Sequence, residues 1–233
     1  MMSDTSTTIS ALGALNSLIG GLFLLTAFGM IVARQVKDCL RLFVLQSLLL
    51  AASAFVLGIE HHSWGLFGVG MVNLISKPVA IPWILRRTCR REVYTRREIN
   101  QVVNVPTSLL IALALTVAAY FVSTPLLQAV EPAFRGHNLP IGLAGLLLGA
   151  YTLTARREAV PLLLGLLAME NGAFFAGIGI ARDLPLLVEL AIATDGLVTV
   201  FIVGVLTRAV QEHIGSTEVG ALATLREGIG AGL

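Results

Sequence analysis

Four ionisable side chains lie deep inside long apolar stretches of the chain, and they are the residues best placed to do chemistry. They are Lys77, Glu170, Glu189 and Asp195. Each such group costs roughly 2.5–3.5 kcal/mol to place at the centre of a bilayer, so intramembrane charges usually pair with one another or serve a function. Carboxyl and amine groups at one depth in a hydrated helix bundle can pass protons along. We therefore interpret Lys77, Glu170 and Asp195 as parts of a proton path, with Glu189 a further member closer to one membrane face.

A static role is the alternative for the same residues. Lys77 could form a fixed pair with one carboxylate, although a single lysine cannot neutralise three of them. A carboxyl group that stays protonated is a second alternative, especially for Glu189. Two amides, Asn73 and Asn171, could hydrogen-bond to these groups in a supporting role, or could simply tie helices together.

The composition indicates which elements carry these residues. The chain has 233 residues, of which 56% are hydrophobic and 13% are charged, whereas soluble domains carry about 25% charged residues. A helix must be about 20 residues long to cross about 30 Å of hydrocarbon. We predict an all-α integral membrane protein, a single membrane domain over residues 1–233 with a tail at 209–233. Its seven predicted transmembrane helices are 11–33, 42–59, 64–85, 104–126, 139–155, 159–181 and 184–207.

The loops between these spans predict the orientation. Twelve Lys and Arg residues follow the first, third, fifth and seventh spans, whereas the opposite loops hold only Arg135 and Arg182. The positive-inside rule then places the N-terminus outside and the C-terminus in the cytoplasm. The net charge of +2 gives no indication of nucleic-acid binding. We expect the arginine-rich loop at 86–97 to set topology, or to contact anionic lipid or a cytoplasmic partner.

Proline and glycine predict two local features. Pro78 and Pro82 follow Lys77 closely, so the third span should be kinked or locally unwound there, because proline removes a backbone hydrogen bond. Such a break could admit water, or could be a simple packing kink. Gly142, Gly145 and Gly149 recur at the spacing that favours close helix packing. The sequence has no P-loop, GxGxxG, HExxH or haem motif, so we expect neither a catalytic residue nor a metal or other cofactor in this chain.

Several segments resemble the hydrogenase-4 component E family, a membrane subunit of group 4 [NiFe] hydrogenase and formate hydrogenlyase complexes. The most specific are MENG and LVELAIATDG, and weaker similarity covers most of the chain. The segments are 169–172 (MENG), 187–196 (LVELAIATDG), 46–50 (QSLLL), 76–85 (SKPVAIPWIL) and the tail at 213–228.

The resemblance implies a finer organisation. Residues 139–208 would be three helices similar to the K-type subunit of respiratory complex I, preceded by a four-helix part at 1–130. In K-type subunits two membrane-embedded glutamates on consecutive helices belong to the axis of proton translocation. Glu170 would match the first and Asp195, one methylene shorter, the second. The K-type pattern itself places its first glutamate at Leu167, about one helical turn before Glu170 on the same face.

The resemblance also implies partners and a function. The partners would be antiporter-like and other membrane subunits, together with a cytoplasmic hydrogenase-like arm that carries the [NiFe] and Fe–S centres. The chain would lie in the cell (inner) membrane of a bacterium or archaeon, contribute to proton translocation and link antiporter-like subunits. The alternatives are a scaffold subunit of the same complex without proton transfer, and a stand-alone carrier of small ions. The reaction of the parent complex, whether linked to formate, CO or hydrogen or run without a metal site, is left open.

Overall fold

The computed structural model describes residues 2–83, 103–129, 138–178 and 204, and within these ranges the fold is helical with no β-strand. Among the described residues, six helices are long and apolar enough to cross a membrane. This agrees with the first six predicted spans, whereas the seventh, 184–207, lies outside the described residues together with Glu189 and Asp195. The elements are α1 (Met2–Val32), α2 (Val36–His61), α3 (Trp64–Ile75), a π-helical turn η1 (Ser76–Ala80), α6 (Val105–Ala129), α7 (Asn138–Ala155) and α8 (Ala159–Ile178).

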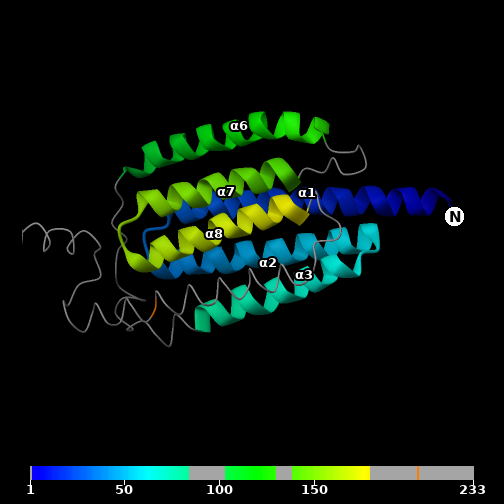
Figure 1. The fold of residues 1–233 in the computed structure, drawn as a ribbon, viewed down its shortest axis with the longest axis horizontal. Helices are drawn as coiled ribbons and strands as arrows, with labels where there is room; N and C mark the ends of the chain where they lie inside the picture. The colour runs from blue at the N-terminus through cyan, green and yellow to red at the C-terminus, as the bar shows by residue number, and fades with distance from the viewer. Residues whose placement is uncertain (1, 84–102, 130–137, 179–203, 205–233) are drawn as a thin grey trace, which may run out of the picture.

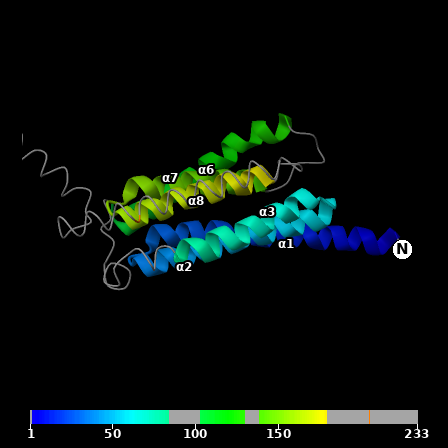
Figure 2. The same ribbon diagram turned by 60° about the horizontal axis from the view of Figure 1, so that its bottom comes forward.

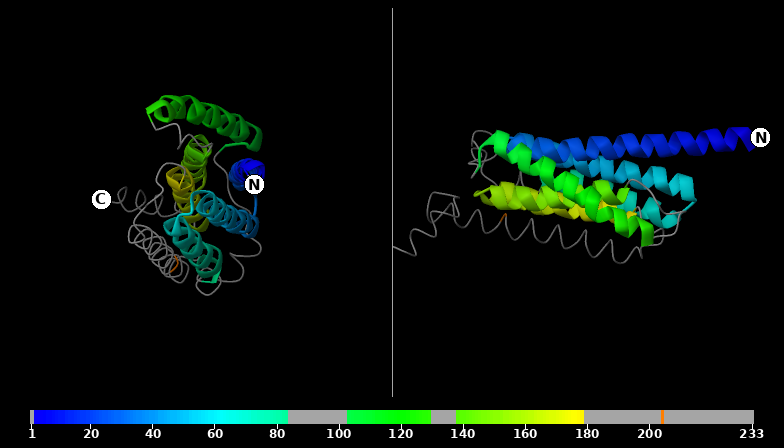
Figure 3. Two further views of the ribbon diagram at one scale, coloured as in Figure 1. Left: turned by 90° about the vertical axis from the view of Figure 1, so that its right-hand side faces the viewer. Right: turned by 90° about the horizontal axis from the view of Figure 1, so that it is seen from above.

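The six helices run nearly side by side in two layers. Figure 1 shows them lying along one direction, and in the turned view of Figure 2 α1, α2 and α3 form one layer while α6, α7 and α8 form the other. The end-on view at the left of Figure 3 shows α7 and α8 between α6 and α2, and the view at its right shows the N-terminal end of α1 extending beyond the other helices. The layers pack directly on each other, because α1 contacts α7 and α2 contacts α8.

Two helices are longer than the spans predicted from hydropathy. α1 begins at Met2 rather than residue 11, and α2 begins at Val36 rather than residue 42. The extra residues include many polar and charged ones, such as Lys37 and Asp38 in the first turn of α2. Hydropathy measures only the part of a helix that suits hydrocarbon, so it misses polar turns that continue the same helix beyond it.

Glycines allow α7 and α8 to pack backbone against backbone, as their spacing predicts. A Cβ atom added to Gly142 would meet the backbone nitrogen of Ala176, and one added to Gly149 would meet that of Met169. On the facing helix, a Cβ atom added to Gly172 of α8 would meet the backbone nitrogen of Leu146 in α7. This close contact fixes the position of α8 and therefore of the residues that it carries.

The third span departs from α-helical geometry where the prolines predict it. α3 ends at Ile75, and the π-helical turn η1 contains Lys77 and Pro78. Pro78 has no N–H to donate to the preceding turn, and its ring clashes with a regular α-helix there. A π-turn inserts one extra residue into the helix and changes the direction in which its side chains point. The expected local unwinding beside Lys77 is thus confirmed.

A buried arginine and a ring of buried polar side chains join the layers at other points. Arg156, in the short connection between α7 and α8, donates from Nη2 to the carbonyl oxygens of Met30, Ile31 and Ala33 at 2.8, 2.8 and 3.0 Å, which satisfies the C-terminal end of α1. Burial lowers the pKa of this guanidinium. Further along the bundle, three buried polar side chains from α1, α2 and α7 form a closed hydrogen-bonded ring: Asn16, Ser53 and Asn138.

Candidate functional site

A layer of polar side chains crosses the middle of the bundle between two apolar clusters. On α2 the first cluster includes Phe43 and the second includes Leu50, and the polar pair Gln46 and Ser47 lies between them. The same order occurs on α8, where the polar residues follow Leu167 and Ala168 of the first cluster and precede Phe174 and Phe175 of the second. The polar layer is therefore separated from both ends of the bundle by packed hydrocarbon.

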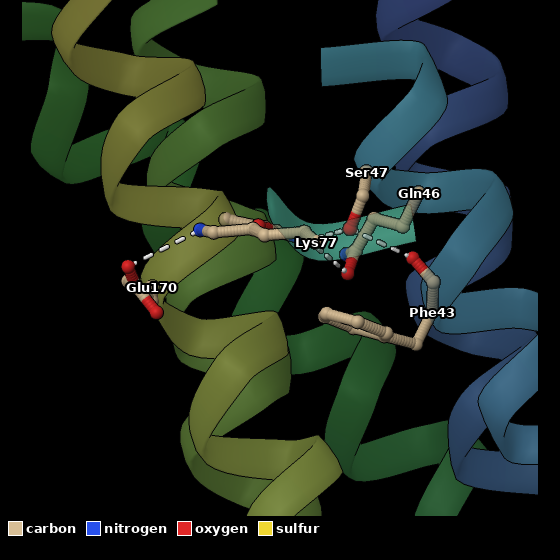
Figure 4. A network of polar contacts seen from close by, with 6 residues as sticks. Phe43, Gln46, Ser47, Lys77 and Glu170 are labelled. Atoms are coloured by element: carbon tan, nitrogen blue, oxygen red, sulfur yellow. Dashed lines mark hydrogen bonds and ion pairs between the residues drawn. The ribbon is translucent and has the colours of Figure 1, made fainter. Parts of the chain in front are cut away.

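Lys77 and Glu170 form an ion pair within this layer. Lys77 Nζ lies 3.2 Å from Glu170 Oε1, and Figure 4 shows the lysine side chain reaching from η1 towards α8. The lysine side chain is 2% exposed and the glutamate side chain 20%. The lysine is thus buried and the glutamate side chain is partly exposed, although its paired oxygen Oε1 is itself buried.

Asn171 gives Lys77 a second acceptor. Its Oδ1 accepts a hydrogen bond of 2.8 Å from Lys77 Nζ, and its side chain is fully buried. The ammonium also lies 4.9 Å from the ring centroid of Phe174, a cation–π contact. Because Glu170, Asn171 and Phe174 are all on α8, one face of this helix supplies a charged, a polar and an aromatic partner to the lysine.

Gln46 and Ser47 of α2 complete the network, although the sequence does not predict them as site residues. Asn171 Nδ2 donates to Ser47 Oγ at 2.9 Å and, less closely, to Gln46 Oε1 at 3.4 Å. Ser47 Oγ in turn donates to the carbonyl oxygen of Phe43 at 3.0 Å, and Figure 4 shows these residues meeting Lys77 from the α2 side. Gln46 and Ser47 are adjacent polar residues within a largely apolar span, and this sequence feature could have indicated their contribution.

The other predicted site residues fall in different places. Asn73 is buried in α3, four residues before Lys77, and the hydrogen bond that links Lys77 to α8 is made with Asn171. Leu167, which the K-type pattern aligns with its first glutamate, is 1% exposed and packs in an apolar cluster. Glu189 and Asp195 lie outside the described residues. Across the described part of the chain, no three His, Cys, Asp or Glu residues group in a way that could hold a metal ion.

The geometry separates the roles that the two charged groups can play. An ammonium group has three donors and no acceptor, and Lys77 uses them in a buried position on Glu170 and Asn171. Glu170 is the less buried partner, and the contact between Lys77 and Asn171 does not depend on its carboxylate. The arrangement holds a buried lysine between a carboxyl group and an amide oxygen, which are the groups that a proton-exchanging site would need.

The chain is similar to known proteins over most of its length. The uncharacterized protein Rv0085 of Mycobacterium tuberculosis is 30% identical over 208 residues, which cover 89% of this chain and 94% of that protein. Hydrogenase-4 component E of Escherichia coli K12 is 26% identical over 220 residues, covering 89% of this chain and 95% of that protein. The protein of the same name from Shigella flexneri has the same identity and coverage. No family model matches the chain, and no solved structure matches it significantly.

Proposed function

Because the chain belongs to one family with Rv0085 and is a distant homologue of hydrogenase-4 component E, we propose that it is a membrane subunit of a hydrogenase-type complex and takes part in proton translocation. Homology over nearly the whole length of both proteins supports the membership of a multi-subunit membrane complex. The proton-translocating role rests on the site itself, and the observation that carries it is the Lys77–Glu170 pair within the polar layer.

The cost of this pair supports a functional role. Two charges in a hydrocarbon environment are expensive to bury, and replacing a buried ion pair by apolar residues often stabilises a protein. The chain nevertheless keeps Lys77 and Glu170, together with the neutral residues that satisfy the lysine. A pair that only joined helices could be replaced by packing of the kind that the glycines already provide between α7 and α8.

The direction of access supports proton exchange at Glu170. Apolar clusters lie on both sides of the polar layer along α2 and α8, and Glu170, with a side chain 20% exposed, is the member of the ion pair nearer the edge of the described helices. A proton that arrives there finds a group held beside a buried cation. Protonation of Glu170 would leave Lys77 in place on Asn171, and release of the proton would restore the ion pair.

The finer parts of the proposal follow from the resemblance. Asp195 is proposed as the second carboxyl group of the path, with Glu189 nearer the outer face. Residues 139–208 would form the part that resembles the K-type subunit, after the four-helix part at 1–130 and before the cytoplasmic tail at 209–233. Antiporter-like subunits would be its membrane partners. The [NiFe] and Fe–S centres would belong to a cytoplasmic arm, in a bacterial or archaeal cell membrane.

A scaffold role is the second candidate, and one observation favours it. The network of Lys77, Asn171 and Ser47 joins η1, α8 and α2 through buried hydrogen bonds. If this joining were its whole role, loss of Lys77 or Glu170 would reduce the amount of assembled complex. The coupling of the remaining complex would be unchanged.

The test uses the intact complex purified through a tag on this chain. We expect hydrogenase-type subunits to co-purify, and we expect Glu170→Gln to lower redox-driven proton uptake into vesicles at least tenfold per complex, with assembly retained. Glu170→Asp, which keeps a carboxyl group, should retain part of the uptake. Purification of the chain alone would support a stand-alone carrier, and full proton uptake by an assembled Glu170→Gln complex would support the scaffold. Either result overturns the proposal.

A further inference from the structure

The hydrogen bonds of the polar layer run in a single direction, from Lys77 towards α2. Lys77 Nζ can only donate as an ammonium, so the atom of Asn171 that faces it at 2.8 Å must be the carbonyl oxygen Oδ1. The amide nitrogen of Asn171 must then face the other way. There it meets two oxygen atoms of α2, Ser47 Oγ and Gln46 Oε1.

Ser47 is oriented to receive this hydrogen bond. Its single hydroxyl proton is donated to the carbonyl oxygen of Phe43, four residues earlier in α2, at 3.0 Å. The lone pairs of Ser47 Oγ are therefore the part that faces Asn171 Nδ2, at 2.9 Å. A serine that bonds back to its own helix in this way presents an acceptor of fixed direction.

We propose that Ser47 is a positioning residue, which holds the amide of Asn171 so that its carbonyl oxygen stays on Lys77 whether or not Glu170 carries a proton. This inference rests on the proposed function, because it assigns a role within the same proton-exchanging site. Gln46 assists through its longer contact, but Ser47 supplies the shorter one. The role is an indirect one, since Ser47 acts on Lys77 only through Asn171.

The consequence concerns the neutral state of the site. When Glu170 is protonated, Lys77 loses the partner with the opposite charge and depends on the carbonyl oxygen of Asn171 and the ring of Phe174. If the amide turned over, its N–H groups would face the ammonium and the cation would lose its uncharged acceptor. Fixing the amide therefore keeps the carbonyl oxygen of Asn171 on Lys77 while the proton is exchanged at Glu170.

The charged surroundings of Lys77 are simple within the described residues. Glu170 on α8 is the charged group that contacts it, and α2 faces the network with the neutral side chains of Gln46 and Ser47. α8 adds the neutral side chains of Asn171 and Phe174. A change in the pH dependence of a Ser47 variant would therefore report on the Lys77–Glu170 pair and on the amide that supports it.

Two replacements of nearly equal shape test the role of the hydroxyl group. Ser47→Thr keeps a hydroxyl group that can bond to the same backbone carbonyl, whereas Ser47→Val puts a methyl group in its place. Both add one group of similar volume to the same buried position, so any effect of crowding is common to the two. Redox-driven proton uptake by the intact complex in vesicles is measured across the pH range, and uptake is expressed per assembled complex.

We expect Ser47→Val to lower proton uptake roughly two- to tenfold relative to Ser47→Thr, the factor that one hydrogen bond provides. The pH profile of uptake should also differ between the two variants, because valine leaves the amide of Asn171 without its acceptor on residue 47. Equal rates and equal pH profiles for the two variants overturn the inference. Glu170→Gln is measured alongside: if it lowers uptake while the Thr and Val variants agree, the positioning role alone fails, and if it has no effect the proposed function fails as well.

Discussion

At the scale of single residues, the account depends on the energetics of one buried ion pair. Removing one member of such a pair leaves an uncompensated charge in the interior, which costs about 3–5 kcal/mol, whereas removing both can cost little. Glu170 is 20% exposed and Lys77 only 2%. Loss of the partner therefore costs more free energy when Lys77 is the charge left behind than when Glu170 is.

The first prediction is that the two positions are energetically coupled. Glu170→Gln should destabilise the chain by about 3 kcal/mol, near the lower end of that range because the carboxylate is partly exposed. Adding Lys77→Met should recover at least about 1 kcal/mol of this loss, since no buried charge is then left. The free energy of unfolding would be measured by titrating the protein in mixed micelles with a denaturing detergent. Strictly additive effects of the two substitutions would show that the side chains do not interact.

The sequence identified some of these residues and not others, for physical reasons. The sequence identified Lys77 and Glu170 because a charged side chain within an apolar span has a high free-energy cost of insertion, which usually goes with pairing or function. Ser47 and Gln46 carry a much smaller cost, and neutral polar residues in membrane helices commonly bond to their own backbone or to a neighbouring helix. Their role depends on which helix α2 faces, and that is determined by packing between residues about 125 positions apart in the chain.

At the scale of helices, the position of the site depends on how closely α7 and α8 approach. The glycine spacing in α7 predicted this contact, although 139–155 was the shortest of the predicted spans. The partner glycine in α8, Gly172, follows directly after Asn171, so the residue that allows the close approach is next to a residue of the site. Packing and site geometry are thus coupled on one helix.

The second prediction compares two glycines. Gly172→Ala would place a methyl group against the backbone nitrogen of Leu146, and we expect it to destabilise the chain by about 1–3 kcal/mol, the usual range for overpacking. Gly21→Ala is the control, because no atom lies within 4 Å of its added Cβ, and it should be neutral or stabilising by up to about 1 kcal/mol. Thermal unfolding in detergent would compare the two. Equal stability of both variants would rule out the close contact.

The third prediction concerns the end of α1. Arg156 is 4% exposed and donates to three carbonyl oxygens in and just after the last turn of α1, whereas the next residue, Arg157, is exposed. Arg156→Met should cost about 2–3 kcal/mol, as expected for hydrogen bonds that involve a charged group, and Arg157→Met should change stability by less than about 0.5 kcal/mol. Detergent unfolding of both variants provides the measurement. A similar loss in both would mean that total charge, and not the capping of α1, is responsible.

At the scale of the whole molecule, charge distribution predicts how the chain lies in the membrane. Twelve basic residues follow alternate spans and two lie in the opposite loops. The described part of the chain contains six of the candidate spans, and the orientation stays a prediction. Hydropathy and charge can predict how many times a chain crosses the bilayer and in which sense, but they contain no information on which helices touch, because every span is apolar on most sides.

The fourth prediction is therefore a topology. A fluorescent protein fused to the C-terminus should fluoresce in cells, since it folds in the cytoplasm, and alkaline phosphatase fused there should be inactive. Fused after residue 62, in the connection between α2 and α3, phosphatase should be active because that connection is predicted to lie outside. The reverse pattern would invert the orientation and place the arginine-rich loop at 86–97 away from the cytoplasm.

The central claim is that Glu170 gains and loses a proton inside the membrane while Lys77 keeps its charge. Infrared difference spectra of the intact complex, recorded between acid and alkaline pH, measure this directly through the carbonyl stretch of protonated carboxyl groups. We predict a carboxyl band that titrates in the wild type, is absent in Glu170→Gln and is retained in Asp38→Asn, where an exposed carboxylate is removed instead. An identical titrating band in wild type and Glu170→Gln would show that Glu170 does not exchange protons and would contradict the account.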